Sequence, residues 1–332
     1  MKIGNLNRYN KERISTGTMK GLELSRRYWE TYGREMLQRD FPEIKGLVAV
    51  GLCGSGSEVL GYDDEISRDH DFEPGFCLFL PGEDMVDRRT AFRLERAYAK
   101  LPGEFEGIAR ARLSPVGGSR HGVIRLADFL REKTGGEDGR MTLRDWMTVP
   151  EQNLLELTGG EIWMDESGAF TGIRQRLSFF PEDIRLRKLS GELLILNQSG
   201  QYNYRRCLDH GEKGAAMMAV HTFVGAGLHV LHLLEGVYMP YYKWAFRSLR
   251  EMGKDRAKQA ERLEGILFGN EDDDALENRE FAMADFCQEV AEELQERGLT
   301  EASCCDMEQH AYSVADRIFD PEIRNMHILS GI

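Results

Sequence analysis

The sequence predicts an α+β protein, in which a mixed sheet with flanking helices is followed by an all-α helical bundle. Two observations lead to this prediction. Short apolar runs of strand-like composition alternate with amphipathic stretches in the first half of the chain, as expected where sheet and helix share one domain. After residue 178 only helical periodicity is found, which is typical of a bundle. We therefore predict two domains, residues 1–178 and residues 179–332.

The first half combines strand and helix patterns. The apolar run GLVAVGLCG predicts a buried strand, and FCLFL and HGVIRL predict two more. EIWMD predicts an edge strand. Amphipathic spacing predicts a helix that ends before Pro42, and another that begins at Asp84 and ends before Pro102. The predicted strands are residues 46–54, 69–72, 76–80, 121–126 and 161–165, and the predicted helices are residues 17–39, 84–101 and 126–132.

The second half shows no convincing strand. Its acidic stretch GNEDDDALEN is expected to be a solvated loop between two helices. The predicted helices are residues 184–197, 214–235, 241–252, 254–267, 276–297 and 302–319.

Composition limits the functional classes. The chain has 332 residues, of which 41% are hydrophobic, and 43 basic against 56 acidic residues give a net charge of −13. This balance is that of a globular protein and makes a nucleic-acid or membrane-surface binder unlikely, although it leaves a local basic cleft open. We see no apolar run approaching bilayer length, no apolar signal core at the N-terminus and no metal-binding cysteine spacing. We therefore expect a cytoplasmic protein with reduced thiols.

The stretch GLCGSGSEVLGYDDEISRDHDFEPGFCLFLP concentrates acidic residues behind a Gly/Ser turn. Like charges this close repel one another, so a cation is expected among them. On a strand, Asp69 and Asp71 would project from the same face and His70 from the other. Magnesium favours such a carboxylate pair. The six crowded acids are Asp63, Asp64, Glu65, Asp69, Asp71 and Glu73.

The turn before these acids suggests a phosphate site. Gly54 and Ser55 directly follow the predicted buried strand, and thirteen residues separate Ser55 from Asp69. Glycine lets the backbone approach a phosphate closely, and serine hydroxyl and backbone N–H groups can bind its oxygens. A phosphate cradle beside a metal-binding acid pair is suited to phosphoryl or nucleotidyl transfer.

Three other motifs share part of this pattern, and each lacks a required residue. A Walker phosphate loop needs lysine where the chain has Tyr62, and the dinucleotide fingerprint needs its third glycine where Val59 stands. A calcium loop that begins at Asp63 needs glycine in place of Arg68. The remaining alternative is a solvated acidic loop without a ligand, which the ordered succession of strand, turn and paired acids disfavours.

These residues resemble a known superfamily. A strand, Gly-Ser, nine to thirteen residues and then two alternating acids is the signature of the polymerase-β-like nucleotidyltransferases, matched here by Gly54, Ser55, Asp69, Asp71 and Phe72. More narrowly, GSGSEVLGYDDEISRDHDFEP resembles the domain of unknown function 4037, whose members carry a motif of the type G-S-x-S-x-G-Y-x-S-x-x-S-x-D-H-D-W. The later segments GQYNYRR and YMPYYKWAFRSLR also resemble that family.

The resemblance implies an activity and its residues. Gly54, Ser55 and Ser57 would hold the triphosphate of ATP or another nucleotide, and Asp69 and Asp71 would be catalytic and bind Mg²⁺, in a site with room for two metal ions. A nucleotide monophosphate would pass to a hydroxyl of a small molecule or protein, with pyrophosphate leaving. The acceptor is not identified, and no membrane partner is expected.

The superfamily has a third carboxylate on a neighbouring strand, and the sequence does not supply it. HGVIRL is the natural place but contains no acid. Asp128, just downstream, is more simply an N-terminal residue of the next helix, and Glu106 is a weak substitute. This departure supports an alternative function, a catalytically silent nucleotide-binding regulatory protein that keeps the fold.

The helical half adds one candidate for nucleotide binding. Lys243 and Arg247 lie four residues apart, on one helix face, within reach of a triphosphate. The resemblance favours Lys243. The competing interpretation is that the aromatic residues around them form bundle core while the cations extend to water.

Other polar residues of this half are expected to be structural. Arg205 and Asp209 have the spacing of a helical ion pair. Of the three histidines His221, His229 and His232, the outer two lie about 16 Å apart along a helix, too far to share a metal. Only His229 and His232 are close enough, and buried, hydrogen-bonded histidines are the favoured interpretation.

Overall fold

The computed structural model describes residues 19–66, 72–110, 121–269 and 273–332. By contact the chain forms two compact units, Met1–Val123 with Gly160–Glu166, and Ile124–Gly159 with Ser167–Ile332. These units are defined by contacts and do not test the predicted domain boundary at residue 178, which stays a prediction. Residues 124–159 and 167–178 belong by contact to the helical unit.

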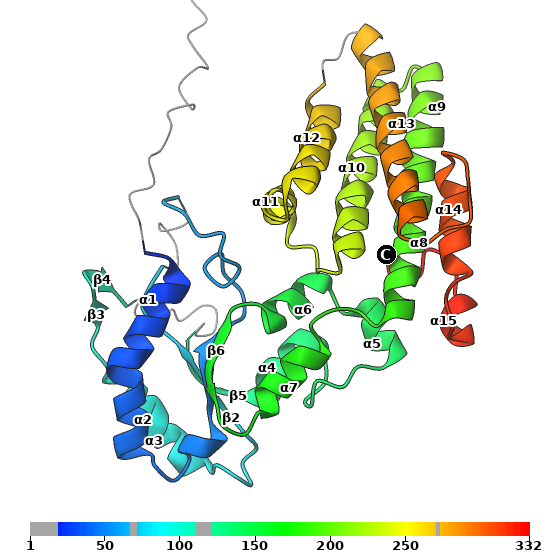
Figure 1. Cartoon of the computed structure of the whole chain (residues 1–332). Coiled ribbons are helices and arrows are strands. Elements are labelled where there is room, and N and C mark those ends of the chain that lie inside the picture. Colours follow the sequence, from blue (N-terminus) through cyan, green and yellow to red (C-terminus); the bar gives the residue numbers. More distant parts are fainter. Residues whose placement is uncertain (1–18, 67–71, 111–120, 270–272) are drawn as a thin grey trace, which may run out of the picture. The chain divides into compact units, whose positions relative to one another are not determined.

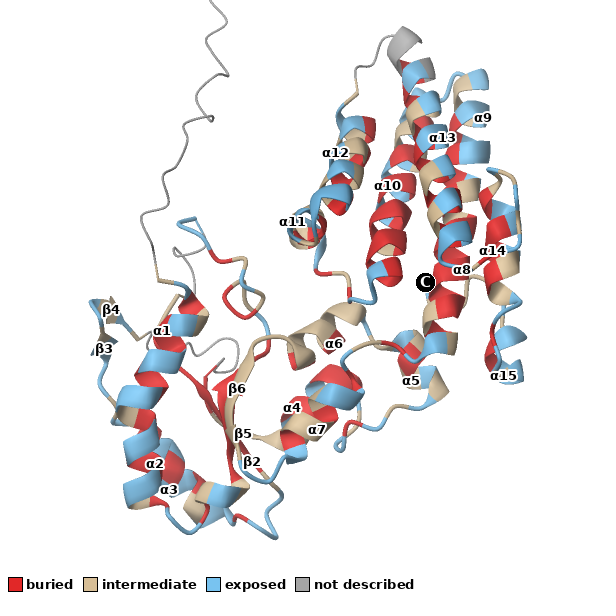
Figure 2. Cartoon of the chain, viewed as in Figure 1, coloured by how far each residue is buried: buried red, intermediate tan, exposed pale blue. Residues whose placement is uncertain are grey.

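A four-stranded sheet organises the first unit, and β1 lies inside it (Figure 1). The order is β5-β2-β1-β6, and β1 pairs antiparallel with both β2 and β6. Every residue of β1 and β2 is buried, as the apolar runs predicted (Figure 2). β6 is an edge strand, as expected. The strands are β1 Ala49–Leu52, β2 Cys77–Leu80, β5 Gly122–Arg125 and β6 Glu161–Asp165.

Helices flank this sheet, which confirms the predicted fold class. The first helical stretch runs through α1 (Gly21–Tyr28), a π-helical turn (Trp29–Gly33) and α2 (Arg34–Asp40) without a break. The second helix, α3 (Arg88–Ala99), begins later than predicted, because Asp87 and not Asp84 caps it: the Thr90 N–H donates to Asp87 Oδ1 at 2.7 Å.

The hydrophobic core of the first unit lies between these helices and the sheet. Gly33 permits close packing, since a Cβ there would lie 2.4 Å from the rings of Phe76 and Trp29. A short hairpin, β3 (Glu104–Phe105) and β4 (Ile108–Ala109), follows α3. Core side chains include Tyr28, Trp29, Leu37, Val50, Phe76, Leu78, Leu94 and Tyr98.

The second unit contains helices throughout its described residues, which confirms the helical C-terminal region. Five of them, α5, α6, α7, α9 and α15, lie outside the predicted helix ranges, because they are short and carry little periodic apolar signal. A π-helical segment, Asn197–Asn203, joins α8 to α9. The helices are α4 Leu126–Thr134, α5 Leu143–Thr148, α6 Glu151–Thr158, α7 Ala169–Arg176, α8 Glu182–Leu196, α9 Tyr204–Asp209, α10 Lys213–Glu235, α11 Tyr242–Glu251, α12 Lys254–Phe268, α13 Asp273–Glu296, α14 Met307–Ala315 and α15 Pro321–Arg324.

Helix α10 corrects one expectation. By length and composition it is apolar enough to cross a membrane, with a mean hydropathy of 1.5 over its most apolar window. The stretch is not a continuous apolar run in the sequence, because His221, Thr222, His229 and His232 interrupt it. Of that window, 67% is buried inside the unit, as in the central helix of a bundle. A cytoplasmic location stays a prediction.

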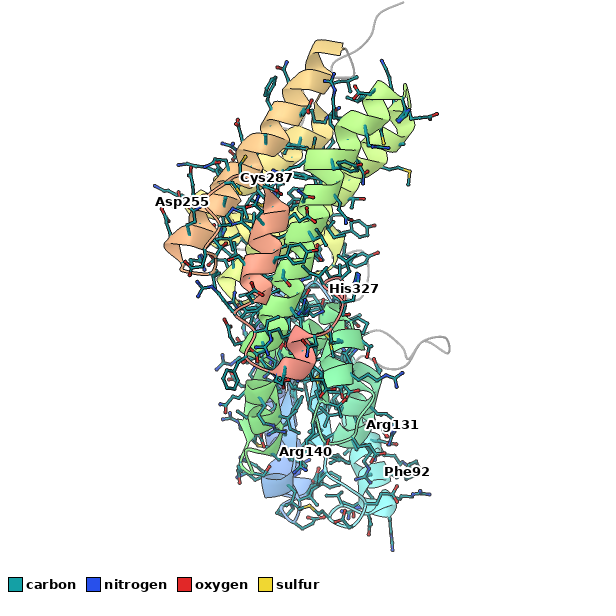
Figure 3. The ribbon with its side chains drawn as sticks, turned by 90° about the vertical axis from the view of Figure 1, so that its right-hand side faces the viewer. Phe92, Arg131, Arg140, Asp255, Cys287 and His327 are labelled. Atoms are coloured by element: carbon teal, nitrogen blue, oxygen red, sulfur yellow. The ribbon has the colours of Figure 1, made fainter. Side chains whose placement is uncertain are left out.

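The cysteines form no disulfide. All six are free, and Cys287 on α13 lies within the helices with no exposed surface (Figure 3). Burial raises the pKa of the Cys287 thiol to about 12, which keeps it protonated and unreactive at neutral pH.

The close approach of β1 and β6 at Gly51 predicts that a side chain there destabilises the sheet. A Cβ at this position of β1 would lie 2.1 Å from the Glu161 carbonyl oxygen on β6. We expect Gly51→Ala to lower the free energy of unfolding by about 2–4 kcal/mol, because the two backbones must separate. Urea denaturation measures this change.

Gly103→Ala is the matched control. No atom lies within 4 Å of a Cβ built at Gly103, so its effect should stay within about 0.5 kcal/mol. Equal stability of the two variants would show that β1 and β6 tolerate the added methyl group.

Candidate functional site

The turn that follows β1 holds three of the predicted site residues. Gly54 and Gly56 have φ angles of +107° and +140°, a region that residues with a side chain rarely adopt. Ser55 between them is exposed, and Ser57 is partly buried. Gly54, Ser55 and Ser57 therefore lie together on one glycine-dependent turn at the end of a buried strand.

Backbone contacts with the start of β6 hold the next residues of the loop. The Gly160 N–H donates to the Val59 carbonyl oxygen at 3.1 Å, and the Tyr62 N–H closes the turn on the Ser57 carbonyl oxygen at 2.8 Å. Gly160 itself has a φ of +67°, and a Cβ there would lie 2.0 Å from the Leu52 carbonyl oxygen. The loop is thus fixed on the sheet by a close backbone approach.

Asp63 is the first of the six crowded acids, and its partners are structural. The side chain is 4% exposed, and Oδ2 accepts a hydrogen bond of 2.8 Å from the Gly21 N–H at the start of α1. The Lys20 ammonium lies 3.4 Å from Oδ1. A helix N-terminus and a cation both stabilise a carboxylate. Asp63 therefore anchors the acidic loop to the first helix.

Glu73, the last of the six, pairs with a histidine that the sequence analysis did not consider. Oε1 of Glu73 lies 3.2 Å from Nδ1 of His121, which is 8% exposed and immediately precedes β5. The imidazole packs against Gly75, where a Cβ would lie 2.4 Å from Nδ1. The segment HGVIRL was considered only as the place of a third carboxylate. It contains no acid, but its first residue is His121.

Asp69 and Asp71 lie outside the described residues, so their role as a metal-binding pair stays a prediction. Between them and Asp63, Asp64 is exposed and accepts the Ile66 N–H at 2.9 Å, and Glu65 is exposed. Among the residues that the structure describes, no group of three or more His, Cys, Asp or Glu side chains is placed to hold a metal ion.

The two substitutes considered for the third carboxylate have other roles. Asp128 stands in the first turn of α4 and pairs with Arg131 at 2.6 Å. Glu106 has a φ of +52°, in the turn between β3 and β4, and pairs with Arg27.

Glu161 is a carboxylate that sequence reasoning missed. It stands opposite Leu52 in the β1–β6 register, at the same end of the sheet as the Gly-Ser turn. Its Oε2 accepts a hydrogen bond of 2.8 Å from the Trp163 indole and lies 3.6 Å from Arg26. Strand order, which the sequence does not give, brings this acid to the turn.

Lys243 belongs to the second unit and is exposed in the first turn of α11. Tyr241 and Tyr242 beside it are 51% and 73% exposed, with ring centroids 4.4 Å apart. These two rings are not bundle core, because the helix begins at Tyr242 and its first turn extends outward; Tyr238 alone of the three tyrosines is buried. The role of Lys243 in nucleotide binding stays a prediction.

The predicted helical ion pair is confirmed. Arg205 Nε lies 3.0 Å from Asp209 Oδ1, and Glu280 lies 3.4 Å from the same guanidinium.

His229 lies between two carboxylates inside the helical unit. Its Nδ1 is 2.8 Å from Glu192 Oε1, and its Nε2 is 2.8 Å from Glu151 Oε2 at an ion-pair distance, without hydrogen-bond alignment. Burial lowers the pKa of His229, but the two carboxylates outweigh burial and raise it to about 10. Because each ring nitrogen faces a different acid, the cluster is an ion-pair network and not a metal site.

His232, one turn later on α10, is held in the opposite protonation state, as a neutral imidazole at neutral pH. Burial lowers its pKa to about 4, and its nitrogens contact the Leu228 carbonyl oxygen at 2.7 Å and Ser248 Oγ at 3.1 Å. His232 is therefore a buried, hydrogen-bonded histidine, as the favoured interpretation expected, and His229 is ion-paired at both ring nitrogens. His221 is exposed, so the interpretation is wrong for that residue.

The His229 network predicts a pH dependence of stability. Its folded-state pKa of about 10 exceeds the ordinary value of 6.5, so its contribution is complete below pH 6.5 and is lost as the pH rises through 10. Over this window the free energy of unfolding of the parent should fall by roughly 3–5 kcal/mol. His229→Gln should be less stable at pH 7 and lack this dependence, as measured by urea denaturation across pH.

His221→Gln serves as the control, since His221 is an exposed histidine on the same helix. It should retain the pH dependence of the parent. Identical pH profiles for the parent and His229→Gln would refute a charged, paired His229.

No curated protein matches the chain. A crystal structure of a nucleotidyltransferase-like protein from Exiguobacterium sibiricum 255-15 is similar over 88% of this chain and 81% of that one, at 14% identity and a TM-score of 0.37. Residues 146–245 match the family model described as domain of unknown function 4037. This match confirms the resemblance to that family which the sequence indicated.

Proposed function

We propose that the protein is a magnesium-dependent nucleotidyltransferase. It moves a nucleotide monophosphate from ATP or another nucleoside triphosphate to a hydroxyl of a small molecule or protein. Pyrophosphate is the leaving group.

One observation carries the proposal: the turn after β1 has a conformation that requires glycine. Gly54 and Gly56 both take positive φ angles, and Ser55 is exposed between them. A serine-bearing turn of this kind, at the end of a buried strand, suits close approach of a phosphate group. The spacing from this turn to Asp69-His70-Asp71 completes the motif.

In this proposal some residues contact the phosphates and others bind the metal ion. Gly54 and Gly56 let the phosphates approach the backbone, and the Ser55 and Ser57 hydroxyls donate to phosphate oxygens. Asp69 and Asp71 are hard oxygen ligands of the type that Mg²⁺ prefers, so the donor chemistry fits this ion. The ion, when bound, neutralises charge on the triphosphate. Lys243 would supply a further positive charge.

The structural partners of the other acids support this division. Asp63 is engaged by Lys20 and the start of α1, and Glu73 by His121. Each of these two carboxylates therefore has a partner within the protein. The cation expected from the crowding is best assigned to the acids of the DHD motif.

The acid pair gives the decisive binding test. Asp69→Asn combined with Asp71→Asn should weaken binding of a nonhydrolysable ATP analogue in the presence of Mg²⁺ by at least about 100-fold, because the carboxylates that hold the ion are lost. Isothermal titration calorimetry measures this affinity for each variant.

Asp64→Asn combined with Glu65→Gln is the matched control. It removes two negative charges from the same segment at exposed positions, and the affinity should change by less than about threefold. If the Asp69/Asp71 variant binds magnesium and nucleotide like the parent, the site lies elsewhere.

A silent nucleotide-binding regulator is the second candidate function, and the lack of an acid on β5 favours it. The two candidates predict different turnover. We expect the parent to release pyrophosphate from ATP when a suitable hydroxyl acceptor is added, and the Asp69/Asp71 variant to release at least about 100-fold less. Nucleotide binding without pyrophosphate release across hydroxyl acceptors of diverse classes would favour the regulator.

A further inference from the structure

A groove in the first unit is lined mainly by basic side chains, although the chain has a net negative charge. It lies between the end of α2 and the end of α3, which run side by side there (Figure 1). Its volume is about 540 Å³, within the range of pockets that hold small molecules. Its charged side chains are Arg39, Arg93, Arg96, Lys100, Glu35 and Asp40.

The floor of the groove is apolar and fixed. Met36 and Phe41 are 4% and 2% exposed, so neither side chain can move far. The Tyr32 ring, which also lines the groove, packs edge-on against Tyr28 with a centroid distance of 5.4 Å. The cations therefore surround a preformed surface, which lowers the entropy cost of binding a ligand there.

The two carboxylates of the groove are already engaged by a single cation. Arg39 donates to Asp40 through two nitrogens, at 2.8 and 3.0 Å, and lies 3.2 Å from Glu35. Asp40 and Glu35 thus both pair with Arg39, and the four cations and two carboxylates that line the groove give it a formal charge of +2.

Two of the other three cations lie on one face of α3, and the third is the residue that directly follows the helix. Arg93, Arg96 and Lys100 are spaced by three and four residues, over about 10 Å of helix. Arg93 lies over the Phe41 ring at 5.2 Å, with Glu43 at 3.7 Å. Within the described part of the chain, no carboxylate lies within ion-pair distance of Arg96 or Lys100; Arg96 contacts the Phe92 ring at 5.9 Å.

The groove is separate from the Gly-Ser turn. Gly21, at the start of α1, packs against Glu58 in the loop that follows the turn. Met36 stands fifteen residues further along the same helical stretch, about 22 Å away at 1.5 Å per residue. A ligand in the groove would therefore not occupy the proposed nucleotide site.

We propose that this groove binds a small anion that carries two or more phosphate groups, a site additional to the proposed nucleotidyl transfer. Arg96 and Lys100, which have no carboxylate partner among the residues that the structure describes, favour a ligand with more than one negative group. The planar guanidinium of Arg96 matches the geometry of phosphate oxygens. An ordinary solvated helix face would explain the charges, but not their convergence on a hollow with an apolar floor.

Inorganic tripolyphosphate is the probe. It is titrated into the full chain in EDTA, without magnesium, and the affinity is measured by isothermal titration calorimetry. Arg96→Gln combined with Lys100→Gln should weaken binding at least tenfold, because both unpaired cations are removed. Both positions are exposed, so the variant should fold, and thermal denaturation followed by circular dichroism confirms this.

Two controls make the result specific. Arg88→Gln combined with Arg89→Gln removes two charges from the same helix outside the groove and should change the affinity less than twofold. Asp69→Asn combined with Asp71→Asn should also leave it unchanged, which separates this site from the proposed nucleotide site.

Two outcomes would overturn the proposal. The first is a parent protein that does not bind tripolyphosphate; if a single-stranded oligoribonucleotide then binds through Arg96 and Lys100, the groove serves a nucleic acid. The second is an equal loss of affinity in the Arg88/Arg89 control.

Discussion

The close approach of β1 and β6 is the constraint on which the first unit depends. Gly51 has no side chain, so the Glu161 carbonyl oxygen can occupy the space where a Cβ would stand, and Gly160 repeats this arrangement beside Leu52. Since β1 is buried and paired on both sides, the residues that follow it leave the sheet at a fixed point. The glycine-dependent turn at Gly54 and Gly56 is set there.

Tertiary contacts divide the acidic segment into residues with different roles. In the sequence the six carboxylates form one cluster, and their crowding alone suggested a bound cation. In the structure Asp63 is stabilised by the N-terminus of α1 and by Lys20, and Glu73 faces His121. These acids bind to the protein's own helix and strand, and so they position the loop on either side of the DHD motif.

In the helical unit, most polar residues that drew attention in the sequence are structural. His229 completes an ion-pair network with Glu151 and Glu192, and His232 stays neutral beside Ser248. Such networks are costly to leave incomplete, which ties the helices into one arrangement. The tyrosines beside Lys243, Tyr241 and Tyr242, are different, since both are exposed and belong to no core.

The sequence by itself determined the buried strands, the long helices and the glycine-dependent turn. Buried strands, long helices and the glycines at Gly54 and Gly56 follow from apolar periodicity and backbone sterics, which act between near neighbours in the chain. The tertiary structure alone decided that Glu161 lies at the end of the sheet that carries the Gly-Ser turn and that His121 lies beside Glu73. It also decided that Tyr241 and Tyr242 are exposed and that residues of α2 and α3 line a basic groove. Each of these depends on strand order or helix packing, which join residues far apart in sequence and leave no local pattern.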